Sequence, residues 1–399
     1  MKVRRETGPV AGFRAAGIHA GIKKTARDLA FIVADAPASV AAVFTRSTIV
    51  GAPVEVSRRH LALGRSRGVI VNSGCSNVAM GERGIRDARR MAGLAARELG
   101  CELEEILVCS TGVIGQPLPL DVLRVGIPKV ALALSPDGFG DASEAIRTTD
   151  THAKPARVTL RLDGREVTIQ GIAKGSGMIE PNMATMLSFI VTDAAIPSKL
   201  LQKMLGRVAD ATYNRLSVDG EGSTSDTVVL MASGACGGAS MRAGSDSARR
   251  FEAALHAVCE DLTRQLARDG EGATKLVIVD VAGARNADEA DRAVRRIGNS
   301  MLVKTAIFGG DPNWGRIMQT IGAERIPWHP EKTRVRVGGV AVFAKGRSAG
   351  PAARARAEKA LAAEEIRIEV DLGMGRAAAR LYTCDLTYEY IRVNAEYTT

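Results

Sequence analysis

The chain has 399 residues, enough to bury a large core, and its 46% hydrophobic and 25% charged residues are typical of a soluble globular protein. Its formal net charge of +10 permits binding of nucleic acids or of anionic metabolites. Basic residues are spread along the chain without interleaved aromatic residues, so nucleic-acid binding is the weaker interpretation.

Cysteine usage and the start of the chain indicate the cellular compartment. The six cysteines form no Cys-x-x-Cys pair, and no histidine stands at zinc-finger spacing from them. We therefore expect reduced thiols in a cytoplasmic protein that has no metal site. Met1 to Glu6 is charged and leads into no apolar signal segment, and no stretch reaches membrane-spanning length. We accordingly expect no membrane partner.

The first hundred residues contain predicted strands followed by one clear helix. Residues 7 to 60 mix short apolar segments, such as Leu29 to Val33, with glycine and proline, which predicts short strands rather than helices. Gly68 to Asn72 is predicted to be a buried strand. Arg83 to Leu99 repeats its apolar residues at helical spacing and is predicted to be an amphipathic helix.

A run of small residues follows the next predicted strand. Leu103 to Cys109 is predicted to be a helix end and a strand, and it leads into Ser110-Thr-Gly-Val-Ile-Gly115. Small residues directly after a strand can direct backbone N–H groups and a hydroxyl toward a ligand, as an oxyanion hole requires. Ser-Thr-Gly by itself is usually a turn, so this pattern alone favours a turn.

Two short elements lead to the centre of the chain. Arg147-Thr-Thr-Asp-Thr151 is predicted to be a polar strand or turn. Arg157 to Ile172 alternates apolar and polar residues around the turn signal Asp163-Gly164, which predicts a β-hairpin.

The motif around which the chain is organised begins at Lys174 and reads Lys-Gly-Ser-Gly-Met-Ile-Glu-Pro-Asn-Met-Ala-Thr up to Thr185. Its glycine, proline and asparagine residues permit tight or strained backbone, and Met186 to Val191 is predicted to be a buried strand. A threonine hydroxyl at a strained turn can attack the preceding carbonyl and cut the chain. The new α-amine, whose pKa would be about 7.7, would act as a base beside the hydroxyl. Threonine is also common at strand starts, so Ala184-Thr185 alone favours a structural role.

The next third of the chain is predicted to alternate helices and strands. Ser198 to Tyr213 is predicted to be helical, and Asn214 to Thr227 is a polar, glycine-rich loop without metal-ligand periodicity. Ala248 to Arg268 is predicted to be a long amphipathic helix, and Leu276 to Asp280 a strand. Glu271 lies between them, where a carboxylate is normally solvated.

The last third is predicted to be a second β-rich region with a C-terminal tail. Its predicted elements are helices at 287–297 and 352–363, a rigid turn within Lys304 to Arg316 anchored by Trp314, and strands at 334–342, 366–372 and 378–386. Leu386 to Val393 resembles a strand that could tie down the tail from Asn394 to Thr399, although termini usually fray.

Six of these motifs together resemble the glutamate N-acetyltransferase family, the ornithine acetyltransferases of arginine biosynthesis. They are Ser110 to Gly115, Arg147 to Thr151, Lys174 to Asp193, Glu271 to Lys275, Lys304 to Arg316 and Tyr390 to Thr399, and the resemblance extends from the first strands to the last residue. It implies an α/β fold of layered helices and mixed sheet, of the N-terminal-nucleophile aminopeptidase type. Residues 1–184 would be an α chain and residues 185–399 a β chain, in a heterotetramer of two α and two β chains.

The resemblance also implies a role for each residue of the site. Cleavage falls between Ala184 and Thr185, and Thr185 then accepts the acetyl group of N2-acetyl-L-ornithine and passes it to L-glutamate. The oxyanion donors correspond to Thr111 and Gly112. The substrate-binding residues correspond to Thr148, Lys174, Thr185, Glu271, Asn394 and Thr399. No cofactor and no metal are implied, and acetyl-CoA is left open as a second acetyl donor.

Two loops depart from the family pattern. Asn72-Ser-Gly-Cys-Ser-Asn77 stands where the family usually has Asn-Ser-Gly-Asn-Ala-Asn. Asp219-Gly-Glu-Gly-Ser-Thr-Ser-Asp226 stands where it usually has Asp-Gly-Asp-Thr-Ser-Thr-Asn-Asp. We expect both loops to approach the active site and to affect the choice of acyl donor.

Two other functions are compatible with the sequence. An N-terminal-nucleophile aminopeptidase or amidase would pass the acyl group to water instead of glutamate. A non-catalytic basic binding protein would neither cleave at Thr185 nor turn over substrate.

Overall fold

The computed structural model describes residues 2–180 and 186–396. Within these residues, the first part of the chain forms a mixed eight-stranded sheet in the order β4-β3-β2-β8-β7-β6-β5, with β1 paired to β2. Its β3–β4 and β7–β8 pairs are parallel. The strands are β1 (Phe13–Ile18), β2 (Leu29–Phe44), β3 (Arg65–Cys75), β4 (Ile106–Val113), β5 (Lys154–Leu162), β6 (Arg165–Lys174), β7 (Leu187–Thr192) and β8 (Thr227–Ala232).

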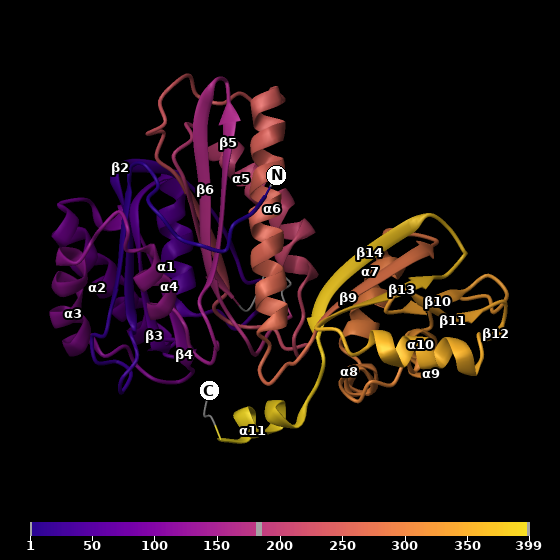
Figure 1. Ribbon diagram of the computed structural model, residues 1–399. Coiled ribbons are helices and arrows are strands. Elements are labelled where there is room, and N and C mark those ends of the chain that lie inside the picture. The colour runs from indigo at the N-terminus through magenta and orange to yellow at the C-terminus, as the bar shows by residue number, and fades with distance from the viewer. Residues whose placement is uncertain (1, 181–185, 397–399) are drawn as a thin grey trace.

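Helices cover this sheet and bury its apolar side chains (Figure 1). They are α1 (Ala52–His60), α2 (Gly81–Leu99), α3 (Leu120–Leu132), α4 (Phe139–Ala145), α5 (Ser198–Ala211) and α6 (Asp246–Arg268). Met91 of α2 and Leu123 of α3 lie in one core with Phe31 of β2. Phe251 of α6 lies in a second core with Ile190 of β7. The opposite side chains of the strands, among them Ile32 of β2 and Phe189 of β7, form a third core with Phe139 of α4.

The C-terminal part forms a second mixed sheet with its own helices, a separate lobe in Figure 1. Within the described residues its strand order is β12-β11-β10-β13-β9-β14. The strands are β9 (Leu276–Ala284), β10 (Arg334–Val337), β11 (Val340–Ala344), β12 (Arg347–Ser348), β13 (Glu365–Asp371) and β14 (Ala377–Cys384). The helices are α7 (Ala287–Gly298), α8 (Met301–Phe308), α9 (Trp314–Ala323) and α10 (Pro351–Ala360).

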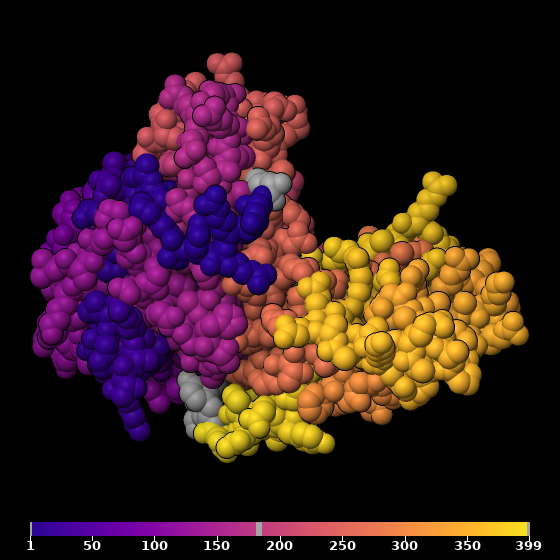
Figure 2. All heavy atoms as spheres, viewed as in Figure 1, coloured from indigo at the N-terminus to yellow at the C-terminus, as the bar shows by residue number. Residues whose placement is uncertain are grey.

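The C-terminal helix α11 (Tyr388–Glu396) leaves that lobe and lies along the lower edge of the molecule, below the first sheet and its helices (Figure 2). The ring of Tyr388 packs edge-on against Phe308 of α8, with 5.7 Å between the ring centroids. None of the helices in the described ranges is both long and apolar enough to cross a membrane.

The strands on either side of residues 181–185 are neighbours in one sheet. β6 and β7 pair antiparallel from Ile169 opposite Thr192 to Lys174 opposite Leu187. β7 is also paired with β8 on its other edge, and all its side chains are buried. Both edges of β7 are therefore hydrogen-bonded, so the predicted division after residue 184 runs through a sheet and not between the two sheets.

The layered α/β architecture predicted from the sequence is confirmed, and so are most of the predicted helices and strands. The prediction of only short strands in residues 7–60 was wrong. β2 is one strand of 16 residues, because its pairing with β3 shifts register between Val33 and Ala38 and accommodates Pro37 at the irregularity. α1 is a helix with Pro53 in its first turn, where proline costs no hydrogen bond.

The strand predicted for Leu386 to Val393 was also wrong, because this segment forms most of α11. The Thr387 hydroxyl accepts a hydrogen bond from the Glu389 N–H, and Arg392 pairs with Glu389 and Glu396 at helical spacing. The rigid turn predicted before Trp314 is confirmed, since it connects α8 to α9, and Trp314 stacks on Phe343.

Candidate active site

One pocket is lined by all the predicted site residues that fall within the described part of the chain. They come from β4, the turn after α4, the end of β6, the loop after α6, and α11. The residues are Thr111, Gly112, Thr148, Lys174, Glu271 and Asn394. The cavity volume is about 100 Å³, several times what one water molecule needs. The other predicted site residues, Ala184, Thr185 and Thr399, lie outside the described residues.

The end of β4 reaches the pocket because two glycines let two strands approach closely. Gly112 stands opposite Gly74 of β3 and has φ of +127°, a conformation that other residues rarely adopt. A Cβ atom on Gly112 would lie 2.4 Å from the backbone carbon of Gly74. Glycine at this position therefore leaves the backbone of Thr111 and Gly112 open toward the pocket, as an oxyanion hole requires.

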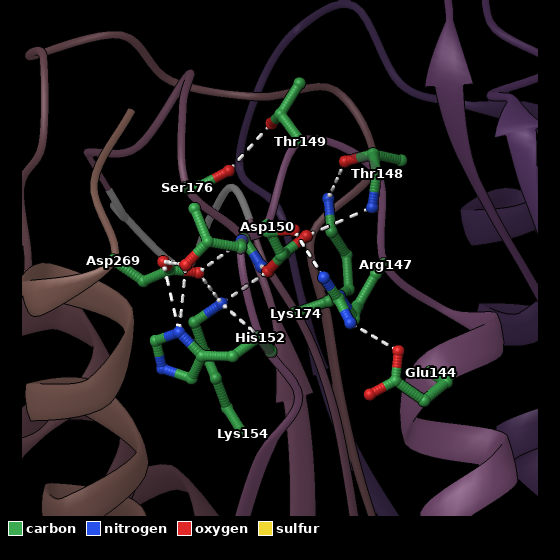
Figure 3. A network of polar contacts seen from close by, with 12 residues as sticks. Glu144, Arg147, Thr148, Thr149, Asp150, His152, Lys154, Lys174, Ser176 and Asp269 are labelled. Carbon is green, nitrogen blue, oxygen red and sulfur yellow. Dashed lines mark hydrogen bonds and ion pairs between the residues drawn. The ribbon is translucent and has the colours of Figure 1, made fainter. Parts of the chain in front are cut away.

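Lys174 is the cation of the pocket. Its Nζ donates to the hydroxyl of Thr148 at 3.0 Å, drawn in Figure 3, and to the hydroxyl of Thr111 at 3.3 Å. Burial lowers the pKa of the Lys174 ammonium, and the charge of Asp150 opposes this effect. An ammonium has three donors, so two hydroxyls leave room for a carboxylate ligand.

A buried ionic network beneath Lys174 fixes the turn that carries Thr148 (Figure 3). Lys154 Nζ lies 2.6 Å from Asp150 Oδ1 and 2.5 Å from Asp269 Oδ2. Asp150 also accepts hydrogen bonds from the backbone N–H groups of Thr148 and Gly175. Burial alone would raise the pKa of Asp150, but Lys154, Lys174 and the Gly175 N–H together hold it well below its usual range.

This network has no signal in the sequence. Asp150 lies within Arg147–Thr151, which the sequence predicts to be only a polar strand or turn. Lys154 and Asp269 are 115 residues apart in sequence. The network ties β5, β6 and the end of α6 to one another, so it positions Thr148 and Lys174 without lining the pocket itself.

Glu271 supplies the carboxylate of the pocket. Its backbone N–H donates to the Ser176 carbonyl at 2.8 Å, and its Oε2 accepts a hydrogen bond of 2.7 Å from the side-chain amide of Asn394. A Cβ atom on Gly177 would lie 2.3 Å from Glu271 Oε2, so glycine is what makes room for this carboxylate. The pocket thus holds an ammonium and a carboxylate, which suits a ligand with both charges, such as an amino acid.

Hydrogen bonds fix residues 178–180, directly before position 181. The N–H groups of Met178 and Ile179 donate to the Asp219 carboxylate at 2.7 and 2.8 Å. Glu180 accepts hydrogen bonds from Asn299 and Arg295. Met178 has φ of +54°, which is uncommon for a residue with a side chain. The predicted lead-in to Thr185 therefore contains one uncommon backbone conformation, at Met178, and its residues 181–185 lie outside the described residues.

Both loops that depart from the family pattern reach the pocket, as predicted. Ser76, which follows Cys75, lines it, and the Cys75 thiol is buried and donates to the Gln116 carbonyl at 3.3 Å. From the second loop, Ser223, Thr224 and Ser225 line the pocket, and the Glu221 carbonyl accepts a hydrogen bond from the Glu180 N–H.

Comparisons with known proteins agree over nearly the whole chain. The sequence model described as the ArgJ family matches residues 14–399. The arginine biosynthesis bifunctional protein ArgJ of Geobacillus kaustophilus is 44% identical over 389 residues, which are 97% of this chain and 95% of that protein. The protein of the same name from Geobacter sulfurreducens is 44% identical over 391 residues, 98% of this chain and 100% of that protein.

Among solved structures, the ornithine acetyltransferase of Mycobacterium tuberculosis complexed with ornithine is 37% identical, with a TM-score of 0.43. The matched region covers 45% of this chain and 98% of that chain. The family match and the identities of the full-length relatives, each over more than nine-tenths of both chains, decide the assignment: the chain belongs to the ArgJ family.

Proposed function

We propose that this chain is a self-cleaving acetyltransferase of arginine biosynthesis, which moves the acetyl group of N2-acetyl-L-ornithine to L-glutamate. The observation that carries the proposal is the single pocket lined by Thr111, Gly112, Lys174, Glu271 and Asn394. The chain belongs to the ArgJ family, whose relatives are named for arginine biosynthesis, and this membership supports a role in that pathway. A cytoplasmic location fits such a role.

Cleavage would come first. The Thr185 hydroxyl attacks the carbonyl carbon of Ala184, the bond from that carbon to the Thr185 nitrogen breaks, and water hydrolyses the resulting ester. The products are an α chain of residues 1–184 and a β chain of residues 185–399. The strain at Met178 and the fixed lead-in support this step. The pairing of β7 with β6 and β8 supports two chains that stay associated, in a heterotetramer of two of each.

Acetyl transfer would then proceed in two half-reactions. The Thr185 amine takes the proton of the Thr185 hydroxyl, which attacks the acetyl carbonyl of acetylornithine, and the proton passes to the leaving ornithine amine. The α-amine of glutamate then attacks acetyl-Thr185 and carries the acetyl group away. Thr111 and Gly112 stabilise the oxyanion in both steps, each donor contributing about 3 kcal/mol.

The charged residues would orient the amino-acid part of either substrate. Lys174, with Thr148, binds the α-carboxylate, and Glu271 with Asn394 binds an amine. Thr399 would add its hydroxyl or the terminal carboxylate. No cofactor is needed for these steps, and acetyl-CoA would serve as a second donor if its acetyl group reaches Thr185.

Product analysis separates this function from the two alternatives. The enzyme, given acetylornithine, should form acetylglutamate only when glutamate is present, with parallel-line, ping-pong kinetics and a trapped acetyl-Thr185 when the acceptor is left out. An amidase would instead release acetate at a rate that does not depend on glutamate. A binding protein would do neither and would also remain one uncut chain.

A further inference from the structure

The C-terminal helix α11 rests on the loop after α6, and none of its side chains is fully buried (Figure 1). The Thr387 hydroxyl, directly before α11, donates to the Gly272 carbonyl at 2.7 Å. A Cβ atom on Gly272, whose φ is +70°, would lie only 2.5 Å from the backbone nitrogen of Tyr390. Glycine at this position therefore lets the backbone of α11 lie directly against the loop. Because burial of apolar surface contributes little to holding α11, its position depends on individual hydrogen bonds.

Tyr390 makes one of these hydrogen bonds, and none of the steps above uses this residue. Its ring is half-buried, and its hydroxyl donates to Asp219 Oδ2 at 3.3 Å. Burial raises the pKa of the Tyr390 phenol, and the negative charges of Asp219 and Glu271 raise it further. The hydroxyl therefore keeps its proton at neutral pH and acts as a donor. Tyr390 is not among the described residues that line the pocket.

Asp219 is the acceptor that fixes the turn of residues 177–179. The Oδ2 atom that accepts the Tyr390 hydroxyl also accepts the Met178 N–H at 2.7 Å, and Oδ1 accepts the Ile179 N–H at 2.8 Å. Gly177 and Met178 line the pocket. A single carboxylate thus connects Tyr390 on α11 to the turn that forms one side of the pocket.

The opposite side of the pocket depends on the same tyrosine. Asn394 stands four residues after Tyr390, and its side-chain amide donates both to the Tyr390 carbonyl at 3.0 Å and to Glu271 Oε2 at 2.7 Å. We propose that Tyr390 is a positioning residue, which through Asp219 fixes Asn394 against the turn of residues 177–179 and so preorganises the pocket for the amino-acid part of the substrate. The proposal rests on the proposed function.

The contacts of Tyr390 determine which kinetic constant it should affect. Its hydroxyl lies on Asp219 and not in the pocket, so it stabilises the docked position of α11 in the free enzyme and in the complex. If α11 is docked for only part of the time, the apparent dissociation constant of the substrate rises in proportion to the lost fraction. Once substrate is bound, Asn394 is again in place and the chemical step is unchanged. Loss of the hydroxyl should therefore raise KM and leave kcat nearly constant.

The test compares Tyr390→Phe with Tyr388→Phe. Each variant removes one hydroxyl from a tyrosine of α11, and Tyr388 is the matched control because it is 80% exposed and its ring contact with Phe308 does not need the hydroxyl. Hydrogen–deuterium exchange of α11 and of residues 177–179 measures the coupling without any substrate. Steady-state kinetics give kcat and KM, intact mass follows cleavage, and thermal unfolding checks that both variants fold.

We expect Tyr390→Phe to cleave like the wild type, to exchange faster both in α11 and at residues 177–179, and to raise KM for acetylornithine about tenfold. Its kcat should stay within about twofold of the wild-type value, and Tyr388→Phe should match the wild type throughout. In an Asn394→Ala background, Tyr390→Phe should add little, because it acts through Asn394.

Three results would overturn the proposal. They are wild-type exchange in both segments of Tyr390→Phe, a fall in kcat at constant KM, and effects of Tyr390→Phe and Asn394→Ala that simply add. A wild type that neither cleaves nor transfers acetyl groups would instead overturn the proposed function. The exchange measurement would still show whether Tyr390 couples α11 to residues 177–179, so the two failures are distinguishable.

Discussion

The side-chain amide of Asn394 donates a hydrogen bond of 2.7 Å to the Glu271 carboxylate, and this contact joins the C-terminal helix α11 to the loop after α6. The same amide also donates to the Tyr390 carbonyl, so Asn394 is held from within its own helix. A segment that would be expected to fray by its position in the chain therefore completes the pocket.

Replacing Asn394 by alanine should impair acetyl transfer and leave cleavage at Thr185 intact. The Glu271 carboxylate would lose a hydrogen bond to a charged group, worth about 2 kcal/mol, so we expect kcat/KM to fall roughly 30-fold. Arg392→Ala, which removes an exposed side chain from the same helix, is the control and should retain full activity. Steady-state kinetics decide this, and equal rates for the two variants would remove Asn394 from the site.

Gly177→Ala should inactivate the enzyme without unfolding it. The added methyl group would meet the end of a flexible side chain, so the Glu271 carboxylate should move out of the pocket at little cost to folding. We expect a large rise in KM and little change in the melting temperature. Gly206→Ala on α5 is the matched control, because its Cβ meets nothing within 4 Å and a helical alanine stabilises by about 0.5–1 kcal/mol. Normal KM in Gly177→Ala would mean that Glu271 does not bind substrate.

Lys174→Gln should weaken binding of the substrate carboxylate, because it removes the positive charge and leaves a shorter, neutral amide near Thr111 and Thr148. Loss of one charge-assisted hydrogen bond should raise KM for glutamate by about tenfold or more. Competition by a glutamate analogue without the α-carboxylate provides the check. If the substitution weakens binding of that analogue as much as it weakens binding of glutamate, Lys174 acts on something other than the carboxylate.

Asp226, directly before β8, is buried, and burial raises the pKa of its carboxyl well above the ordinary value. This shift predicts a pH dependence of stability in the uncut Thr185→Ala chain. Above the unfolded-state pKa of about 3.9 the unfolded chain releases this proton while the folded chain keeps it. Stability should therefore fall as pH rises from about 4, by about 1.4 kcal/mol per pH unit, until the folded carboxyl ionises. Urea unfolding of Thr185→Ala with and without Asp226→Asn measures the difference, and parallel pH profiles would contradict the assigned pKa direction.

The sequence allowed the pocket to be predicted better than the fold around it. Thr111, Lys174 and Glu271 stand in contiguous motifs, so the family resemblance identifies each of them without knowledge of its contacts. Local periodicity also identified α2 and α6, whose apolar faces are buried. The sequence pattern predicted the wrong element where tertiary packing determines the structure, as in α11. Its apolar residues fit the spacing of a strand or of a helix, and Tyr388 packs against Phe308 of α8.

Polar residues that act through distant partners could not be found from the sequence. Lys154 meets Asp150 nearby, but its second partner, Asp269, is brought to it only by the packing of α6 on β5 and β6. Asp226 stands in a loop that resembles an ordinary polar turn, and only the folded chain shows that its side chain is buried. Burial and long-range contacts are properties of the folded chain, so neither can be deduced from the order of residues.

The mass of the purified protein tests the central claim most directly. If Thr185 is the nucleophile, wild-type protein should appear in an intact-mass spectrum as two fragments, residues 1–184 and residues 185–399. Thr185→Ala should appear as one chain of 399 residues and transfer no acetyl group. A wild-type chain that remains whole and still forms acetylglutamate from acetylornithine would contradict both the cleavage and the acetyl-Thr185 intermediate.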